Sequence, residues 1–453
     1  MGVQRRQRDE ESSAPGSRLS ADYITDELSP TAQRILAAAQ RVLRRDGYKG
    51  LTLQRVAEEA GANKSLVIYH FGNKATLMSM LVDSLWHDLD VELFQSVEKL
   101  PVLSDLRISA LIEAQRQLGH LAAQQQMYIE LFASLTRQRD ARRHLGTLNR
   151  SYRDLHRRCL AATRLPADEL MALASLVLAV GDGMAVSLLV RPGDVDDASV
   201  FRLLEDMVLS LAGEARRGVS PSSAPAAGRP GPPQGRGAEN GSSPPDPDPL
   251  AGLAPVARKL VRGAQIVLRK RGFQALTLDA VGRQAGEPRS SITYYFGDKQ
   301  GLITALIEAQ FHEQRKVAQR VLLSPGVGHD CAVGAICAAR ELLTDMTSFR
   351  AFYDLLPVVT REPDFRKMQA EHDRWLAELI VAGLRASGEP ALMARADDLA
   401  VLEMAAADGL AMQMLSDPSG FDPEPSCAML ERLISRHTPK AERGKQRPSI
   451  GAG

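Results

Sequence analysis

The sequence predicts an all-α protein made of two tandem helical units. Apolar residues recur at helical spacing through most of the chain, as at Ile35, Ala39 and Val42, and no run alternates apolar with polar residues as a strand would. Aromatic residues make up only 5% of the chain, which favours helices packed through Leu, Ala and Val over sheets. Two blocks of similar size flank a segment rich in Pro, Gly and Ser.

The composition is that of a globular protein in a reducing compartment. Of the 453 residues, 44% are apolar and 25% are charged, which is ordinary for a soluble protein. The four cysteines show no metal-ligand spacing and are too few for a disulfide scaffold, so we expect a cytoplasmic protein. The N-terminal sequence MGVQRRQRDEE holds no apolar run of the kind found in a signal peptide.

Composition also divides the chain into segments. Residues 1–28 and 438–453 are polar and are predicted to be disordered tails. Residues 218–249 contain nine Pro, six Gly and five Ser, and we predict a linker over 214–251 that is partly flexible and partly extended. Two blocks of nearly equal length remain.

The two blocks are repeats of one another. At a constant offset of 225 residues, 46–77 aligns with 271–302 without a gap. The identical pairs include Gly47 with Gly272, Gly61 with Gly286, Tyr69 with Tyr294, Phe71 with Phe296 and Lys74 with Lys299. Residues 181–189 also correspond to 407–415, at an offset of 226, so the duplication is expected to span both blocks.

Each repeat contains the pattern of a helix-turn-helix motif. In the first repeat, Thr52 is a predicted N-cap and is followed by the apolar stripe of a short helix. Gly61 permits a sharp turn, and Asn63 caps a second short helix whose Val67 and Phe71 face inward. This second helix packs by one edge and leaves its other face free to enter a DNA major groove.

The charge distribution supports contact with DNA, although the net charge of the whole chain is only +1. Residues 30–75 carry a net charge of +5 and residues 255–300 carry +6, which leaves −10 on the rest. Positive charge is therefore concentrated around the two motifs, as a phosphate backbone requires. The residues predicted to face outward are Lys64, Ser65, Leu66, Ile68 and Tyr69 in the first repeat and Arg289, Ser290, Ser291, Thr293 and Tyr294 in the second.

The two motifs resemble a known family. Their sequences GANKSLVIYHFGNK and GEPRSSITYYFGDK are similar to the end of the DNA-binding domain in the tetracycline-repressor (TetR) family, and the resemblance is strong over 33–80 and 258–305. It implies that each unit has three N-terminal helices, a fourth linking helix, and a helical domain for ligand binding and dimerisation. The expected DNA-binding domains are 29–77 and 252–302, and the expected regulatory domains are 78–213 and 303–437.

The resemblance also implies roles for individual residues. Base-facing or groove-facing positions are occupied by Lys64, Leu66, Ile68 and Tyr69, and by Arg289, Ser291, Thr293 and Tyr294. Phosphate-contacting positions are occupied by Thr52, His70 and Lys74, and by Thr277, Tyr295 and Lys299. Asn73 and Asp298 would cap the linking helices, and Gln54 stands where the family often uses a base-reading side chain.

The second repeat departs from the family pattern at three positions. Asp279 is the counterpart of Gln54, and a carboxylate there would repel phosphate or accept a hydrogen bond from a cytosine amino group. Glu287 and Pro288 differ from the usual small apolar residue followed by Ser or Thr. The second motif is therefore expected to bind DNA more weakly or differently, or to have lost DNA binding and to act only as a partner fold.

Helices near the end of each unit are predicted to form an interface between units. They are residues 167–190 with 197–213, and 395–415 with 424–436. The stretch 170–190 is long enough to span a membrane, but the central Asp182 favours a buried interface helix, and no membrane partner is expected. The halves either pair with each other as a single-chain pseudo-dimer, which a linker reach of roughly 30 Å permits, or pair between two chains as a homodimer.

Ligand binding in the regulatory domains is implied by the family resemblance alone. Aromatic, His and Met side chains are candidates to line a pocket for a small hydrophobic or amphipathic effector, although each also suits an ordinary core position. They are His120, Tyr128, Phe132, His144 and Tyr152 in the first unit and Met346, Phe349, Phe352, Tyr353, His372, Trp375 and Met412 in the second.

The sequence therefore predicts a transcriptional regulator, of the repressor kind, that binds a double-stranded DNA operator. Motifs of the common enzyme classes are not found, so no catalytic residue, metal ligand or cofactor is predicted, and the protein is expected not to be an enzyme. The alternative is a ligand-binding or adaptor protein in which one or both motifs have lost DNA binding.

Overall fold

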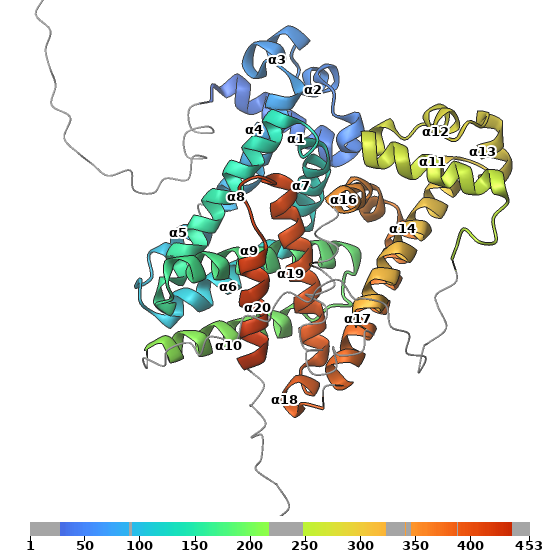
Figure 1. Cartoon of the computed structure of the whole chain (residues 1–453). Coiled ribbons are helices and arrows are strands. Elements are labelled where there is room, and N and C mark those ends of the chain that lie inside the picture. The colour runs from blue at the N-terminus through green and yellow to red at the C-terminus, as the bar shows by residue number, and fades with distance from the viewer. Residues whose placement is uncertain are drawn as a thin grey trace, which may run out of the picture.

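Every regular element in the described part of the chain is a helix, which confirms the predicted all-α fold. The structure, a computed structural model, describes residues 28–89, 93–216, 248–322, 340, 346–386 and 388–436 (Figure 1). The predicted tails and linker lie almost wholly outside these residues, as do Cys331 and Cys337.

The first three helices form a small domain that we call head 1. They are α1 (Pro30–Gly50), α2 (Leu53–Glu59) and α3 (Lys64–Phe71). α1 begins at Ser29, whose hydroxyl accepts a hydrogen bond from the amide of Ala32. Its last turn is interrupted at Gly47, where φ is 66°, in the left-handed region that glycine enters without strain. Val56 and Val67 are fully buried against the apolar stripe of α1 and hold the three helices together.

A second domain, head 2, repeats this arrangement. It consists of α11 (Pro255–Arg271), a 3-10 turn (Phe273–Ala275), α12 (Leu278–Ala285) and α13 (Arg289–Phe296). Gly272, with φ of 80°, ends α11 at the position that corresponds to Gly47. Leu260, Val281 and Ile292 are fully buried in its core.

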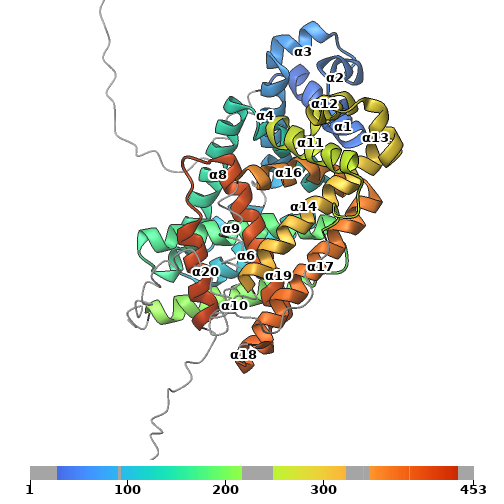
Figure 2. The same ribbon diagram turned by 45° about the vertical axis from the view of Figure 1, so that its right-hand side comes forward.

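One long helix leads from each head into the body of the protein. These helices are α4 (Lys74–Leu89) and α14 (Lys299–Leu322). The predicted caps are confirmed, because Asn73 Oδ1 lies 3.0 Å from the amide nitrogen of Thr76 and Asp298 Oδ1 lies 2.9 Å from that of Gly301. Both heads lie at the same end of the molecule (Figure 2).

The body contains the remaining helices of both halves. In the first half these are α5 (Gln95–Glu98), α6 (Asp105–Gly119), α7 (Ala122–Leu135), α8 (Arg139–Cys159), the 3-10 turn η3 (Leu160–Thr163), α9 (Ala167–Val190) and α10 (Asp197–Arg216). In the second half they are α16 (Met346–Arg361), α17 (Pro363–Ala386), α18 (Pro390–Met393), α19 (Ala396–Ser416) and α20 (Glu424–Arg436). α20 packs against α9, and α10 packs against α19 and α20, so these four helices from the two halves pack together.

The crossing of α9 and α19 is the most extensive helix contact in the described structure. An added Cβ atom at Gly183 would lie 1.9 Å from the carbonyl oxygen of Ala405, and one at Gly409 would lie 1.9 Å from that of Ala179. Each helix therefore packs its backbone directly on the backbone of the other, at two positions related by the duplication.

Both crossing helices are apolar along most of their length. By length and composition α9 and α19 could cross a membrane, but 83% of the most apolar window of α9 and 72% of that of α19 are buried inside the protein. Burial against helices of both halves therefore accounts for their apolar character.

We expect Gly183→Ala to lower the free energy of unfolding by about 3 kcal/mol, because the new methyl group would overlap the backbone of α19. Urea or thermal unfolding measures this change. Gly252→Ala is the matched control, since an added Cβ atom there has no neighbour within 4 Å. Equal stability of the two variants would contradict close backbone contact at the crossing.

His144 on α8 contacts a buried carboxylate, because its Nε2 atom lies 2.8 Å from Oδ1 of Asp83 on α4. The hydrogen bond to Asp83 raises the pKa of His144 in the folded protein. Because the folded pKa is raised, the stabilisation is complete below the unfolded pKa of about 6.5 and is lost as the pH rises through the folded pKa.

We therefore expect His144→Ala to cost about 1–3 kcal/mol of unfolding free energy at pH 5.5 and less at pH 9. Urea unfolding across this pH range measures the difference. His120→Ala serves as the control, because the side chain of His120 is half exposed beside Asp197. A cost that does not depend on pH would show that the His144–Asp83 contact does not titrate.

Candidate nucleic-acid interface

The outer face of α3 carries most of the side chains predicted to meet DNA in head 1. Val67 and Phe71 are buried, whereas the predicted Lys64, Ser65 and Ile68 are exposed. Leu66 and His70 are half-buried at the edges of this face. Tyr69 is 82% exposed, which is unusual for an aromatic side chain and leaves most of its surface accessible to a partner.

Local hydrogen bonds and glycines fix the angle between α2 and α3. Thr52 and Asn63 are the N-caps that the sequence predicts, with Asn63 Oδ1 2.8 Å from the amide nitrogen of Leu66. Gly61 has φ of 61° in the turn between the helices. Thr52 and Gln54 are themselves exposed at the start of α2.

α13 of head 2 presents the corresponding face with different side chains. Arg289, Ser290, Thr293 and Tyr294 are exposed, and Tyr294 is 82% exposed, as Tyr69 is in head 1. Ser291 is half-buried, and Tyr295 and Thr277 are exposed. Pro288 occupies the N-cap position of α13 and provides no side-chain cap, whereas Asn63 caps α3, the corresponding helix of head 1.

The two lysines at the start of the linking helices lie over aromatic rings of their own heads. Lys74 Nζ is 4.0 Å from the ring centroid of Tyr48, and Lys299 Nζ is 5.0 Å from that of Phe273. Both lysines are half-buried, and burial lowers the pKa of each. The rings hold these ammonium groups at the ends of α3 and α13 in the same place on each head.

The clearest difference between the heads is at the position of Gln54. In head 1, Gln54 donates a hydrogen bond to Glu58, with 2.8 Å between Nε2 and Oε1. In head 2, Oδ1 of the corresponding Asp279 lies 3.9 Å from Nη1 of Arg289, and both side chains are mostly exposed. The carboxylate therefore lies within ion-pair distance of the arginine that is predicted to enter the groove.

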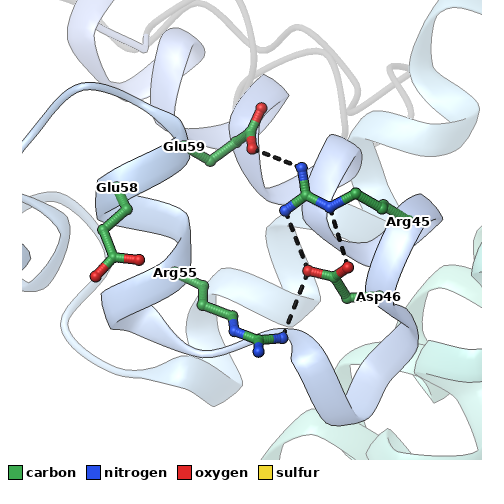
Figure 3. Close-up of a pocket in the computed structure, with 5 residues that line it drawn as sticks. All are labelled: Arg45, Asp46, Arg55, Glu58 and Glu59. Carbon is green, nitrogen blue, oxygen red and sulfur yellow. Dashed lines mark hydrogen bonds and ion pairs between the residues drawn. The ribbon is translucent and has the colours of Figure 1, made fainter.

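A polar hollow of about 480 Å³ on head 1 is lined by Arg45, Asp46, Arg55, Glu58 and Glu59 (Figure 3). The guanidinium of Arg45 lies between Asp46 and Glu59, at 3.0 Å and 2.9 Å, and Arg55 lies 3.5 Å from Asp46. Glu58 also lines the hollow but forms none of these ion pairs. The ion pairs join α1 to α2, and the excess of carboxylates over arginines in the lining disfavours phosphate.

The structure brings some of the proposed effector residues together. Tyr128 and Phe132 of α7 and Phe352 and Tyr353 of α16 form a chain of rings with centroids 5.3–5.8 Å apart, and Met412 packs in the same core cluster. Met346 and Phe349 pack against the edge of this cluster.

The other proposed effector residues lie elsewhere. His120 is half exposed beside Asp197, and His144 bonds to Asp83. Tyr152 packs near Phe94. His372 lies between the rings of Phe311 and Trp375, with centroids 4.3 Å and 6.3 Å away.

Two half-buried carboxylates beside the aromatic cluster were not among the predicted effector residues. Burial raises the pKa of Asp182 on α9 to about 7 and that of Asp408 on α19 to about 8. The hydroxyl of Tyr353 donates to the backbone carbonyl of Asp408 at 2.9 Å. The matched sequences around Asp182 and Asp408 were visible in the repeat, but their closeness to the tyrosines depends on how the two halves pack.

Sequence reasoning also missed Arg137 and Arg361, which lie where the body meets the heads. A signal was available, because residues 128–140 and 352–364 align at a constant offset of 224 and share the pattern Thr-Arg followed by Asp three positions later. The direction in which each arginine reaches could not be read from that pattern.

Comparison with known proteins identifies the two heads. Residues 35–80 and 260–306 each match the family of bacterial regulatory proteins of the tetR type. Residues 339–439 match the C-terminal domain of BetI-type transcriptional repressors.

Individual relatives agree with these matches. The transcriptional regulator BetI of Rhizobium meliloti is 26% identical over 197 residues, which are 42% of this chain and 93% of BetI. Over 84 residues, the regulators ArpR and TtgR, both of Pseudomonas putida, are 34% and 33% identical; this is 18% of the chain and 40% of each relative.

Among solved structures, a transcriptional regulator from Rhodococcus sp. Rha1 has a TM-score of 0.35 and 18% identity, covering 40% of this chain and 94% of that one. The repeated match and the duplicated helix-turn-helix geometry agree along the chain. The protein is therefore a DNA-binding transcriptional regulator whose chain carries the DNA-binding domain of the tetR family twice.

Proposed function

We propose that this regulator is a ligand-responsive repressor that works as a single-chain pseudo-dimer on an operator with two unlike half-sites. The observation that carries the proposal is that one chain exposes two recognition faces of different chemistry at the same end of the molecule. Leu66 and Ile68 give α3 an apolar edge, whereas Ser291 and Thr293 give α13 a polar one. A repressor of this kind would act in the cytoplasm, where the DNA lies.

The exposed side chains suit the two tasks of a DNA-binding helix. Lys64 and Arg289 are exposed and would read guanine or contact phosphate, and the exposed Tyr69 and Tyr294 would pack on thymine methyl groups or the backbone. Ser65 and Ser290 stand at the exposed starts of α3 and α13, where backbone amides attract phosphate. The proposed contact surface also includes Thr52, Gln54, His70 and Lys74 in head 1 and Thr277, Tyr295 and Lys299 in head 2.

Pairing within one chain is supported by the interface between the halves. The crossing of α9 and α19 is apolar and tightly packed, and α10 and α20 extend it on both sides. The four helices are the ones that the sequence assigned to dimerisation, and their surfaces face one another within one chain. A homodimer of tandem chains would need a further surface of this kind.

Effector binding is proposed at the aromatic cluster between α7 and α16. Its rings and the adjoining Asp182 and Asp408 offer an apolar wall with a few polar groups, which suits a small amphipathic molecule. Such a ligand would bias the equilibrium between head spacings that fit and misfit the operator, a coupling typically worth about 1–3 kcal/mol.

The operator itself tests the pseudo-dimer. DNA selected from a random pool and then footprinted should contain two half-sites of different sequence. Operators in which either half-site is duplicated should bind at least about tenfold more weakly, because each places several mismatched base pairs under one head. Equal, high affinity for both symmetrised operators would contradict the proposal, and the absence of any salt-dependent binding would favour an adaptor protein.

Substitutions should assign each head to its half-site. Lys64→Ala is expected to weaken binding at one half-site and Arg289→Ala at the other, each by about 1–3 kcal/mol if the side chain reads a base. Binding to operators mutated in one half-site measures the assignment. Lys367→Ala is the control, because Lys367 is an exposed cation on α17. Equal loss at both half-sites from one variant would contradict separate reading by two heads.

Removing the carboxylate in head 2 should strengthen DNA binding. Asp279→Asn frees Arg289 and takes a negative charge from the recognition face, so we expect affinity for the second half-site to rise by up to about fivefold. Fluorescence anisotropy at low salt measures this change, with Glu313→Gln, an equal change of charge on α14, as the control. A loss of affinity would instead indicate that Asp279 accepts a hydrogen bond from cytosine.

A further inference from the structure

We propose that Arg137 and Arg361 are positioning residues that reach from the body of one half to the head of the other and together set the spacing of the two heads on DNA. The inference rests on the proposed DNA binding by both heads. The two arginines lie outside the recognition faces and the proposed effector residues, and each forms its contacts in a different part of the chain.

The contact beneath head 2 is made by Arg137 of the first half. Arg137 follows the end of α7, and its Nε atom lies 2.8 Å from Oδ2 of Asp354 on α16. Its Nη2 atom donates to the carbonyl oxygen of Leu268, in the last turn of α11, at 3.0 Å. We call this set of Arg137, Asp354 and Leu268 the head-2 clamp.

The contact beneath head 1 is made by Arg361 of the second half. Arg361 ends α16, and its guanidinium bonds to Glu130 on α7. Its Nη2 atom donates to the carbonyl oxygens of Leu43 and Arg44 on α1, at 3.2 Å and 3.5 Å. Glu130 also accepts from the amide of Tyr48, with 2.6 Å between the two atoms. We call this set the head-1 clamp.

The two clamps have the same design. Both arginines donate to carbonyl groups near the C-terminal end of a head's first helix, where a cation is favoured by the helix dipole. Both pair with a carboxylate of the opposite half that is almost completely buried, since the side chain of Asp354 is 4% exposed and that of Glu130 is 2% exposed. A pair with a buried partner is held in one geometry far more firmly than a surface pair.

Glycines make room for both arginines. An added Cβ atom at Gly272 would lie 2.5 Å from Nε of Arg137, and one at Gly47 would lie 2.9 Å from Oε2 of Glu130 and 3.3 Å from Cζ of Arg361. Both glycines have a positive φ, so the turn that ends each first helix both needs glycine and leaves space for the opposite half.

The crossed arrangement has a mechanical consequence. Each head is joined to its own half by the linking helix and to the other half by a clamp, so neither head can turn without disturbing the partner half. Heads held at two points should accept only a narrow range of half-site spacings.

The experiment measures how affinity depends on the spacing between the two selected half-sites, varied one base pair at a time. The full-length wild-type protein should show one sharp optimum. Arg137→Ala and Arg361→Ala should each lower the affinity at that optimum about tenfold. For each variant, the affinity at other spacings should then come within about threefold of its affinity at the optimum. Affinity for an isolated half-site should change by less than about twofold.

Further variants separate positioning from folding. Arg137→Lys keeps the charge but cannot bond the carboxylate and the carbonyl with the same fork, so its spacing profile should also broaden. The double variant Arg137→Asp, Asp354→Arg keeps an ion pair between the halves but removes the guanidinium of Arg137 that donates to the carbonyl of Leu268. Its spacing profile should therefore broaden as well. Arg395→Ala is the matched control, because Arg395 makes an exposed ion pair to Asp206 of the other half at 3.1 Å.

Hydrogen exchange without DNA provides an independent readout. Arg137→Ala in the first half should speed amide exchange at the end of α11 in head 2, and Arg361→Ala in the second half should speed it at the end of α1 in head 1. The inference would be overturned if amide exchange became faster only in the half that carries the substitution. A spacing optimum as sharp as that of the wild type would also overturn it. Absence of DNA binding by the wild type would count against the proposed function, while the exchange pattern would still decide whether the clamps exist.

Discussion

Direct contact between the backbones of α9 and α19 is the constraint on which the rest of this structure depends. Two glycines in register with two carbonyl oxygens allow the helices to approach far more closely than alanine would. That approach buries a continuous surface of Leu, Ala and Val from both halves. Once these helices are fixed, α7 meets α16. The aromatic cluster and both clamps lie where α7 meets α16.

Much of the fold and of the DNA-binding face could be predicted because it depends on local signals. Thr52 and Asn63 cap helices through atoms three residues away, and Gly61 turns the chain where a left-handed conformation is needed. The inward positions Val67 and Phe71 follow from helical periodicity alone. The resemblance to a known family added the assignment of the outward residues to DNA.

The rest of the candidate sites could not be predicted, because they are formed by residues far apart in sequence. Residue type alone cannot distinguish Tyr128 and Tyr353 from His120 as effector contacts. Packing between the halves separates them, because the two tyrosines are buried in the core and His120 lies at the surface. The partner of Arg137 is Asp354, and its partner carbonyl belongs to Leu268. Neither partner follows from the spacing of residues along the chain.

The presence of both halves of the central interface in one polypeptide has a consequence for regulation at low copy number. In a dimer of separate subunits, dilution dissociates the pair and removes the bound form at the operator. In the proposed pseudo-dimer, the covalent link between the halves would keep the local concentration of each half constant around the other, whatever the number of molecules in the cell. A few molecules would therefore occupy an operator with full avidity. A substitution at one residue would also alter only one side of the complex with DNA.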